Sequence, residues 1–390
     1  MKYDFDTVIE RRNTKSVKWD LVEEMYNDKD VLPMWVADMD FKVPQVIIDA
    51  IKKRAEHGIF GYTLSGEKYN EAVVNWMKRR HDWSIKPEWI VFTPGVVPAI
   101  NLIIRTYTQP GDEVIIQTPV YHPFYKAIKN SGCQVVKNPL IYKEQKYTIN
   151  FEDLENKITN RTRMLILCNP HNPVGRVWTK EELTKLGQIC LKHNILVVSD
   201  EIHFDLTYKS SKHTVFASIS EEFSQNSIIC TAPSKTFNIA GLKTSNIIIP
   251  NKRLRNLLNI TLENIAIKEP TIFGGEALIA AYNYGEEWLN QLIDYLQENL
   301  DYIMEYFKRR IPKLKVIKPE GTYLVWFDCS ELNMTSEQLR DFFVKKVKVG
   351  FDDGIMFGNE GQQFQRINIA CPRTILKQAL RRIETEINKL

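Results

Sequence analysis

Apolar residues recur along this chain with two different spacings, one typical of helices and one typical of strands. Spacings of three and four residues predict helices over 44–57, 67–80, 98–107 and 286–310. Short apolar runs predict strands over 113–117, 164–168, 195–199, 227–230 and 245–249. Turn and cap residues support these bounds, because Pro44 opens the first helix, Gly58 follows it, and Thr179 with Glu182 has the spacing of a capping box.

The order of these elements predicts an α/β fold with two domains. Strands that are apolar on both faces and alternate with helices favour a mostly parallel sheet of the seven-stranded type, with helices on both faces. This alternation fades after about residue 285, where a long charged helix, a strand over 321–328, a helix from Ser336 and a strand over 365–370 indicate a smaller α+β domain. We expect residues 44–285 to form the large domain, and residues 1–43 with 286–390 to form the small one.

Composition and charge exclude several classes of protein. The chain has 52 basic and 48 acidic residues and no basic block, which predicts neither a nucleic-acid nor a membrane partner. The charged N-terminal segment does not resemble a signal peptide, and no apolar run could span a bilayer. Six scattered cysteines without CxxC pairs favour reduced, buried thiols over disulfides or a metal site, so we expect a cytoplasmic location.

Three groups of polar residues follow three successive predicted strands. Ligands of open α/β sheets bind at the carboxyl ends of the strands, so these positions are informative. The groups are Asn169-Pro170-His171-Asn172, Asp200-Glu201-Ile202-His203 and Ser234-Lys235-Thr236-Phe237.

Together these groups satisfy the requirements of pyridoxal 5′-phosphate (PLP). The cofactor needs an amine for its aldehyde, a carboxylate beside its ring nitrogen and a hydrogen-bond donor to its phenolate oxygen. Lys235 can supply the amine as a Schiff base, Asp200 can pair with the ring nitrogen, and Asn172 can donate to the phenolate oxygen. Each residue alone is weak, since a loop lysine is usually solvated and a strand-terminal aspartate is often a helix cap. The complete set in order predicts a PLP enzyme.

The sequence also resembles a known family over nearly its whole length. It is similar to the fold-type I PLP enzymes of the class I/II aminotransferase superfamily, and within them to the MalY/PatB branch of cystathionine β-lyases and cysteine-S-conjugate β-lyases. The resemblance rests on the motifs Met34-Trp35-Val36-Ala37-Asp38-Met39-Asp40-Phe41, Phe60-Gly61-Tyr62-Thr63, Asn169-Pro170-His171-Asn172-Pro173-Val174-Gly175-Arg176, Ser199-Asp200-Glu201-Ile202-His203 and Ser234-Lys235-Thr236-Phe237-Asn238-Ile239-Ala240-Gly241-Leu242.

The resemblance implies further contacts to the cofactor. The backbone N–H groups of Val96 and Val97 would cradle the phosphate at a helix N-terminus, and Tyr121 would stack on the ring. Tyr62 would reach the phosphate of a neighbouring subunit, which implies a homodimer with active sites at its interface. Packing at an interface or in the core is the alternative role for Tyr62.

Other positions in the cofactor site are less uniform across the superfamily. His203 stands where many relatives have a tyrosine that bonds the phenolate oxygen, although it could be a structural histidine. Ser234 is a candidate for a phosphate contact, and Thr231 is a weaker one. Lys243 replaces an arginine that clamps the phosphate in many aminotransferases, and it offers charge without the fork geometry of that contact.

The resemblance also implies a substrate site. Arg373 matches an arginine that grips the α-carboxylate of an amino-acid substrate, with a surface position at a helix start as its alternative. Tyr323, Trp35 and Ala37 would line the pocket.

The expected activity is β-elimination from L-cystathionine or a related cysteine S-conjugate, giving a thiol, pyruvate and ammonia. The same proton removal by Lys235 also permits transamination, so an aminotransferase is the alternative. A non-catalytic PLP-binding regulatory protein is a further alternative, which the complete residue set disfavours. A nicotinamide dehydrogenase is disfavoured by the absence of G-x-G-x-x-G.

Overall fold

A seven-stranded sheet forms the centre of the larger part of the protein. The computed structural model describes residues 2–390. The strand order is β2-β10-β9-β8-β7-β3-β4, in which β10 alone runs antiparallel to its neighbours. The predicted mostly parallel sheet is therefore confirmed. The strands are β2 (Ile90–Thr93), β3 (Glu113–Thr118), β4 (Gln134–Pro139), β7 (Thr162–Cys168), β8 (Leu196–Asp200), β9 (Ser227–Thr231) and β10 (Ser245–Ile248).

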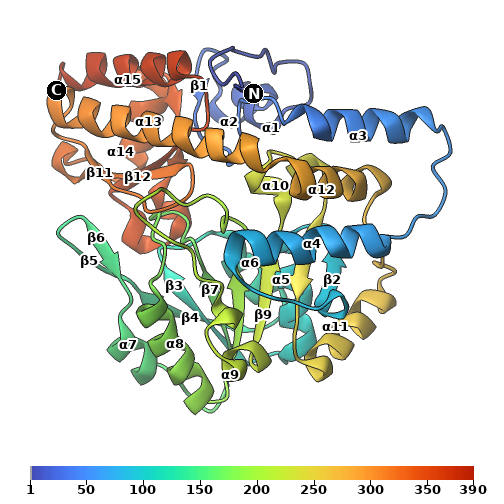
Figure 1. Cartoon of the computed structure of the whole chain (residues 1–390). Helices are drawn as coiled ribbons and strands as arrows, with labels where there is room; N and C mark the ends of the chain where they lie inside the picture. The colour runs from blue at the N-terminus through green and yellow to red at the C-terminus, as the bar shows by residue number, and fades with distance from the viewer. Residues whose placement is uncertain (1) are drawn as a thin grey trace.

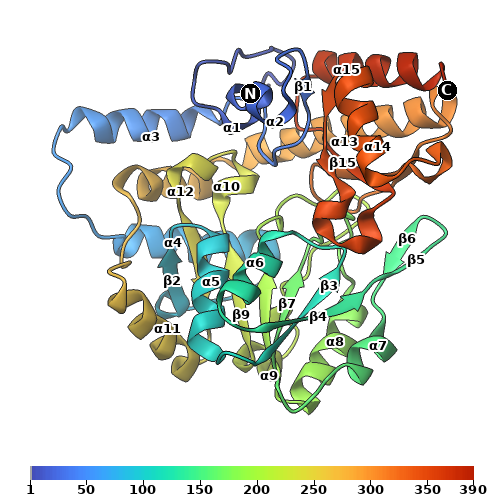
Figure 2. The ribbon, with the colours of Figure 1, turned by 180° about the vertical axis from the view of Figure 1, so that it is seen from behind.

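Helices cover both faces of this sheet, as Figures 1 and 2 show from opposite sides. Successive strand residues point to opposite faces, so Val114 and Ile116 belong to one buried cluster while Ile115 belongs to the other. One face packs against α5 (Val96–Tyr107), α6 (Pro123–Asn130) and α11 (Lys252–Asn264). The other face packs against α4 (Gly66–His81), α8 (Lys180–Lys192), α9 (Glu221–Gln225) and α12 (Ile272–Tyr284).

A second sheet lies in the C-terminal part of the chain. Its antiparallel order is β11-β12-β15-β14, built from β11 (Lys315–Ile317), β12 (Leu324–Asp328), β14 (Asp352–Asp353) and β15 (Phe364–Asn368). The helices α13 (Glu286–Arg310), α14 (Ser336–Asp341) and α15 (Arg373–Ile387) accompany it (Figure 1).

The N-terminal segment joins this C-terminal part through a short parallel pair. Strand β1 (Leu32–Pro33) pairs with β13 (Val349–Gly350). In both views β1 lies beside α15 at the top of the molecule (Figures 1 and 2). The domain boundaries near residues 44 and 285 stay predictions.

The remaining elements are short or connect the two sheets. They are α1 (Val17–Asp20), α2 (Val22–Tyr26), α3 (Gln45–Glu56), α7 (Phe151–Asn156), α10 (Pro233–Thr236), the hairpin β5 (Ile141–Lys143) with β6 (Lys146–Thr148), the 3₁₀ turns η1 (Pro87–Trp89), η2 (Phe216–Ser218), η3 (Ala240–Leu242), η4 (Ser330–Leu332), η6 (Gly354–Phe357) and η7 (Asn359–Gly361), and the π-helical turn η5 (Phe342–Val347).

Most predicted elements are confirmed, and three of the differences bear on the site. The strand expected from residue 321 begins at Leu324, because Thr322 has a φ of 69° and its N–H donates to Leu206 O outside the sheet. Helix α5 begins two residues earlier than expected, directly after Gly95. Lys235, which we expected in a loop, lies in the four-residue helix α10, where Pro233 occupies the first turn.

The capping box of Thr179 and Glu182 is confirmed at the start of α8. All six cysteines of the chain are buried and free, as expected of reduced thiols. Across residues 2–390, no helix combines the length and the apolar character needed to cross a membrane.

Candidate active site

Three adjacent strands bring the expected cofactor residues together. In the register of the parallel strands, Cys168 of β7 pairs with Asp200 of β8, and Asp200 pairs with Cys230 of β9. The chain leaves β7 toward Asn172, ends β8 at Asp200, and leaves β9 into α10 with Lys235. The three carboxyl ends therefore meet at one edge of the sheet, where ligands of such sheets bind.

Lys235 has an amine that is readily deprotonated. Its Nζ donates to the backbone oxygen of Ala37 at 2.7 Å. Desolvation lowers the pKa of Lys235 to about 8; Asp38 and Asp200 oppose this shift, while Arg366 adds to it. Near neutral pH about a tenth of such an amine is unprotonated, far more than for an ordinary lysine, and this is the form that a nucleophile or a general base requires.

Asp200 is a buried carboxyl group that forms no salt bridge within residues 2–390. Its Oδ1 accepts a hydrogen bond from the N–H of Ile202 at 3.1 Å. Burial raises the pKa of Asp200 to about 7; the Ile202 N–H and Lys235 oppose this shift, while Glu201 adds to it. A carboxylate placed this way is stabilised by a protonated ring nitrogen beside it.

Asn172 connects the site to the second sheet. Its Oδ1 accepts from Nη1 of Arg366 at 2.8 Å, and its backbone oxygen accepts from the N–H of Tyr121 at 3.1 Å. The amide nitrogen of Asn172 is thereby oriented to donate elsewhere. Tyr121 is partly buried in the same region, and the charges of Arg366 and Asp200 both influence its pKa, which burial raises.

The start of α5 presents free backbone donors. Gly95 precedes the helix with φ of 151° and ψ of 159°, a conformation that favours glycine. No side chain caps this end, so the first N–H groups, including those of Val96 and Val97, lack the intrahelical partners of later turns. An anion fits such a helix start.

The other phosphate candidates differ in their surroundings. Ser234 is half-buried in the first turn of α10. The hydroxyl of Thr231 already donates to Asn246 O at 3.2 Å. Lys243 is exposed and has a left-handed backbone with φ of 53°.

The N-terminal segment forms another wall of the site. Ala37 O accepts from Tyr323 Oη at 2.9 Å as well as from Lys235. Arg366 Nη2 donates to Trp35 O at 3.3 Å. The expected residues Ala37 and Tyr323 therefore lie beside Lys235, whereas Trp35 contributes its backbone oxygen and its indole Nε1 donates to Lys18 O at 3.2 Å.

His203 also faces this wall. Its ring meets that of Tyr323 edge to face at 6.0 Å, and burial together with nearby Lys235 and Arg366 holds its pKa well below the usual range. It is therefore a neutral imidazole at neutral pH.

The structure places Arg373 elsewhere, which corrects the expectation that it belongs to this site. Arg373 begins α15, where its Nε donates to Asn299 Oδ1 and its guanidinium lies over the ring of Tyr302 at 5.0 Å. Asn299 is itself tied to Ile369 O and Cys371 O. The start of α15 thus directs the Arg373 side chain toward α13.

Arg366 is the arginine that the structure brings to the site. It lies in β15, is 4% exposed, and contacts Asn172, Trp35 O and the carboxylate of Asp352. The signal in the sequence is an arginine inside the predicted strand 365–370, because an arginine buried in a strand needs a polar partner.

Tyr62 is not brought to Lys235 within one chain. It lies fully exposed in the connection between α3 and α4, together with the exposed apolar side chains of Ile59, Phe60 and Leu64. Figure 2 shows this connection extending from the side of the molecule.

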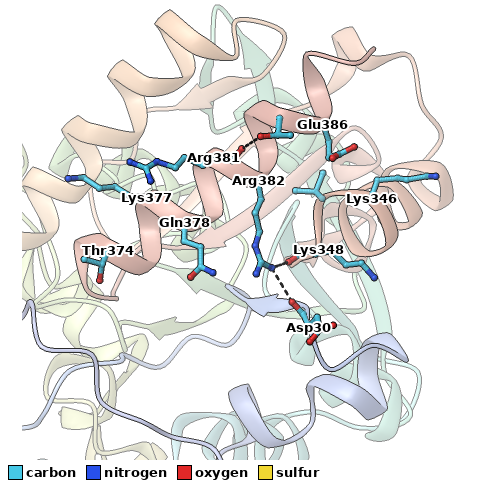
Figure 3. Close-up of a pocket in the computed structure, with 11 residues that line it drawn as sticks. Asp30, Lys346, Lys348, Thr374, Lys377, Gln378, Arg381, Arg382 and Glu386 are labelled. Carbon is cyan, nitrogen blue, oxygen red and sulfur yellow. Dashed lines mark hydrogen bonds between the residues drawn. The ribbon is translucent and has the colours of Figure 1, made fainter.

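A separate cavity of about 730 Å³ lies on the small-domain side, between α15 and η5. Figure 3 shows its basic lining, in which Arg382 donates to the backbone oxygens of Asp30 and Lys348. Its lining residues, all within 2–390, include none of the groups around Lys235. This cavity is therefore distinct from the candidate active site.

Comparisons with known proteins agree with this geometry. The aminotransferase class I and II family matches residues 29–383. Cystathionine β-lyase PatB of Bacillus subtilis is 44% identical over 386 residues, covering 99% of this chain and 100% of the relative.

Two solved structures are also similar. Cystalysin from Treponema denticola, whose structure contains a pyridoxal 5′-phosphate cofactor, is 41% identical with a TM-score of 0.97, and the match covers 100% of both chains. The PLP-bound C-S lyase from Staphylococcus hominis is 34% identical with a TM-score of 0.93, and the match covers 99% of this chain and 98% of that one. The chain therefore belongs to the aminotransferase class I and II family.

Proposed function

We propose that this protein is a PLP-dependent carbon–sulfur β-lyase that acts on L-cystathionine or related cysteine S-conjugates. The observation that carries the proposal is the meeting of Lys235, Asp200 and Asn172 at three adjacent strand ends, with Arg366 beside them. The relatives named as a cystathionine β-lyase and a C-S lyase support the choice of reaction.

The groups at this site fit PLP. A partly buried amine, a buried carboxyl and an uncapped helix start offer partners for the aldehyde, the ring nitrogen and the phosphate. Among residues 2–390, Nδ1 of His203 and Nε of Arg366 are buried polar atoms without a hydrogen-bond partner. Such orphaned atoms are costly unless a ligand satisfies them.

When bound, PLP supplies an aldehyde for the substrate amine and a ring that accepts the electrons left at Cα. Asp200 would keep a proton on the ring nitrogen, Asn172 would donate to the phenolate oxygen, and Val96 and Val97 with Ser234 would hold the phosphate. Tyr121 would lie on the ring face, and His203 would lie near the phenolate side.

We assign substrate orientation to Arg366 in place of Arg373. A planar guanidinium binds a carboxylate through two hydrogen bonds and so fixes the direction of the Cα–H bond. Lys235 Nζ, released from the cofactor, would take the Cα proton as general base. Trp35, Ala37 and Tyr323 would enclose the substrate and limit the access of water.

The pathway then divides according to the fate of the Cα electrons. Where Cβ bears a thiolate, its loss followed by addition of water would give pyruvate and ammonia, whereas transfer of the substrate amino group to PLP would give transamination. Lys235 can serve both paths, so the preference for elimination rests on the similarity to named lyases.

We also propose a homodimer in which Tyr62 of one protomer completes the site of its partner. The exposed apolar residues beside Tyr62 support an interface there, since monomeric proteins rarely leave such a group in water. Sedimentation of the protein should give a dimer, and Tyr62→Phe should weaken PLP retention. A monomeric holoenzyme with full activity would contradict this proposal. The six free, buried thiols support a reducing, cytoplasmic location.

The test supplies holoenzyme with L-cystathionine and, separately, with several amino acids plus 2-oxoglutarate. We expect pyruvate from cystathionine, no such release by Lys235→Ala, and unchanged release by the matched control Lys180→Ala at an exposed position. Glutamate formation without pyruvate would favour the aminotransferase alternative. Full activity in Lys235→Ala would contradict the site itself.

A further inference from the structure

Behind helix α10 lies a buried polar network that the proposed reaction does not use. Its centre is Asp205, whose side chain is 0% exposed. The carboxylate accepts from Thr236 Oγ1 at 2.7 Å and from Trp76 Nε1 at 3.2 Å. His81 Nε2 lies 2.8 Å from Oδ1, the oxygen that also accepts from Trp76, whereas Thr236 donates to Oδ2. A carboxylate so far from water is costly unless each partner is in place, so this arrangement is specific.

A second carboxylate–histidine pair adjoins the first. Glu201 Oε2 lies 2.8 Å from His213 Nε2, and Glu201 Oε1 accepts from Ser199 Oγ and from the N–H of Phe216. The rings of His81 and His213 meet edge to face at 5.7 Å. The network therefore includes the chain neighbours of two site residues. Glu201 follows Asp200, and Thr236 follows Lys235.

Helix α10 depends on such outside contacts for its position. It has only four residues and no side-chain cap, and a helix this short is not stable by itself. Thr236 follows Lys235 directly and is fully buried. Its hydrogen bond to Asp205 connects the turn carrying Lys235 to α4, because Trp76 and His81 of α4 contact the same carboxylate.

We propose that Asp205, acting through Thr236, is a positioning residue that holds Lys235 at the place from which its amine removes the substrate Cα proton. The inference rests on the proposed function. Neither Asp205 nor Thr236 would touch the substrate; their hydrogen bond would fix the backbone of α10, and with it the distance from Lys235 Nζ to the reacting carbon. A displacement of about 1 Å in such a group can cost about 100-fold in rate.

The test compares three substitutions of one residue. Thr236→Val removes the hydroxyl and keeps the shape, Thr236→Ser keeps the hydroxyl, and Thr236→Ala serves as the second variant without a hydroxyl if the valine protein does not fold. Each holoenzyme is assayed with L-cystathionine and with the Cα-deuterated substrate. The midpoint pH of the visible absorbance change of the bound cofactor is measured in the same samples, because it reports the surroundings of Lys235.

We expect Thr236→Val to lower kcat by roughly 10- to 100-fold with KM changed less than about 3-fold. We also expect a larger deuterium isotope effect and a shifted absorbance midpoint. Thr236→Ser should restore all three values. A hydroxyl-free variant with kcat within about 2-fold of the wild type would overturn the proposal. Equal losses of kcat in the serine and hydroxyl-free variants, with an unchanged isotope effect, would also overturn it, because they would indicate a general packing role for Thr236.

Failure of the proposed function would look different. A wild-type protein that releases no pyruvate, yet binds PLP with a normal spectrum, would contradict the lyase assignment. In that case the absorbance midpoint of the Thr236 variants still tests whether the network positions Lys235, and an unshifted midpoint in the hydroxyl-free variant would overturn the inference.

Discussion

Replacing Arg366 by lysine should separate substrate orientation from charge. Arg366 donates to Asn172 Oδ1 at 2.8 Å and to Trp35 O at 3.3 Å, and it pairs with the buried Asp352. A lysine can keep the charge beside Asp352 and so avoids an uncompensated carboxylate, which would cost about 3–5 kcal/mol of stability. It cannot also present the two parallel N–H groups that a substrate carboxylate would use.

The expected loss follows from one charge-assisted hydrogen bond. Such a bond contributes about 1.5–3 kcal/mol, and each ~1.4 kcal/mol corresponds to tenfold in rate. We therefore expect Arg366→Lys to lower kcat/KM for cystathionine by roughly 10- to 100-fold, through both KM and kcat, because Arg366 would bind the carboxylate and also orient the Cα–H bond. Continuous detection of pyruvate over a range of substrate concentrations gives both constants.

The matched control is Arg373→Lys. Arg373 contacts Asn299 and Tyr302 rather than the residues around Lys235, so its replacement should change kcat/KM by less than about 3-fold. The reasoning is refuted if Arg373→Lys shows the large loss and Arg366→Lys does not. Urea unfolding of both proteins shows whether a loss of stability has entered the comparison.

Three further predictions concern buried ionisable groups. The rate at which cofactor-free protein captures PLP should rise with pH and level off above about pH 8, because the pKa of Lys235 is about 8 and only the unprotonated amine reacts; a rise that continues to pH 10 would contradict this. Burial raises the pKa of Asp200 to about 7, so its ionisation opposes folding above that pH. Asp200→Asn should therefore leave the urea midpoint of the cofactor-free protein at pH 8 unchanged or higher. The same substitution should weaken PLP binding measured by equilibrium dialysis. Lys18→Met removes a fully buried partner of Asp40, 2.6 Å away, and should lower the free energy of unfolding by about 3 kcal/mol. This is the low end for a broken buried pair, because Arg11 still pairs with Asp40. An unchanged urea midpoint would contradict this prediction.

Local periodicity was sufficient to predict the elements that carry the cofactor residues. The predicted helix 286–310 coincides with α13, and the strands before Asn172 and Lys235 are where the apolar runs indicated. These segments are long or strongly apolar, so tertiary contacts did not change their conformation. The helical turn at Lys235 was missed, although Pro233 is a residue that favours a helix start.

The substrate side of the site was harder to predict because it depends on side-chain direction across distant segments. Arg373 and Arg366 are seven positions apart, yet one faces α13 and the other faces Asn172. Nothing local in the sequence states that the start of α15 turns the Arg373 side chain away. The alternation of β15 does place Arg366 and Asn368 on one face, and Asn368 holds the backbone oxygens of Val36 and Asp38 at 2.6 Å each.

Peptide mapping of the borohydride-reduced holoenzyme is the most direct test of the central claim. Reduction should fix the cofactor covalently to the amine that holds it. The account predicts a pyridoxyl group on the peptide that contains Lys235 and loss of the yellow absorbance near ~420 nm. A modified lysine elsewhere in the chain, or a colourless protein that retains no PLP before reduction, would contradict the account.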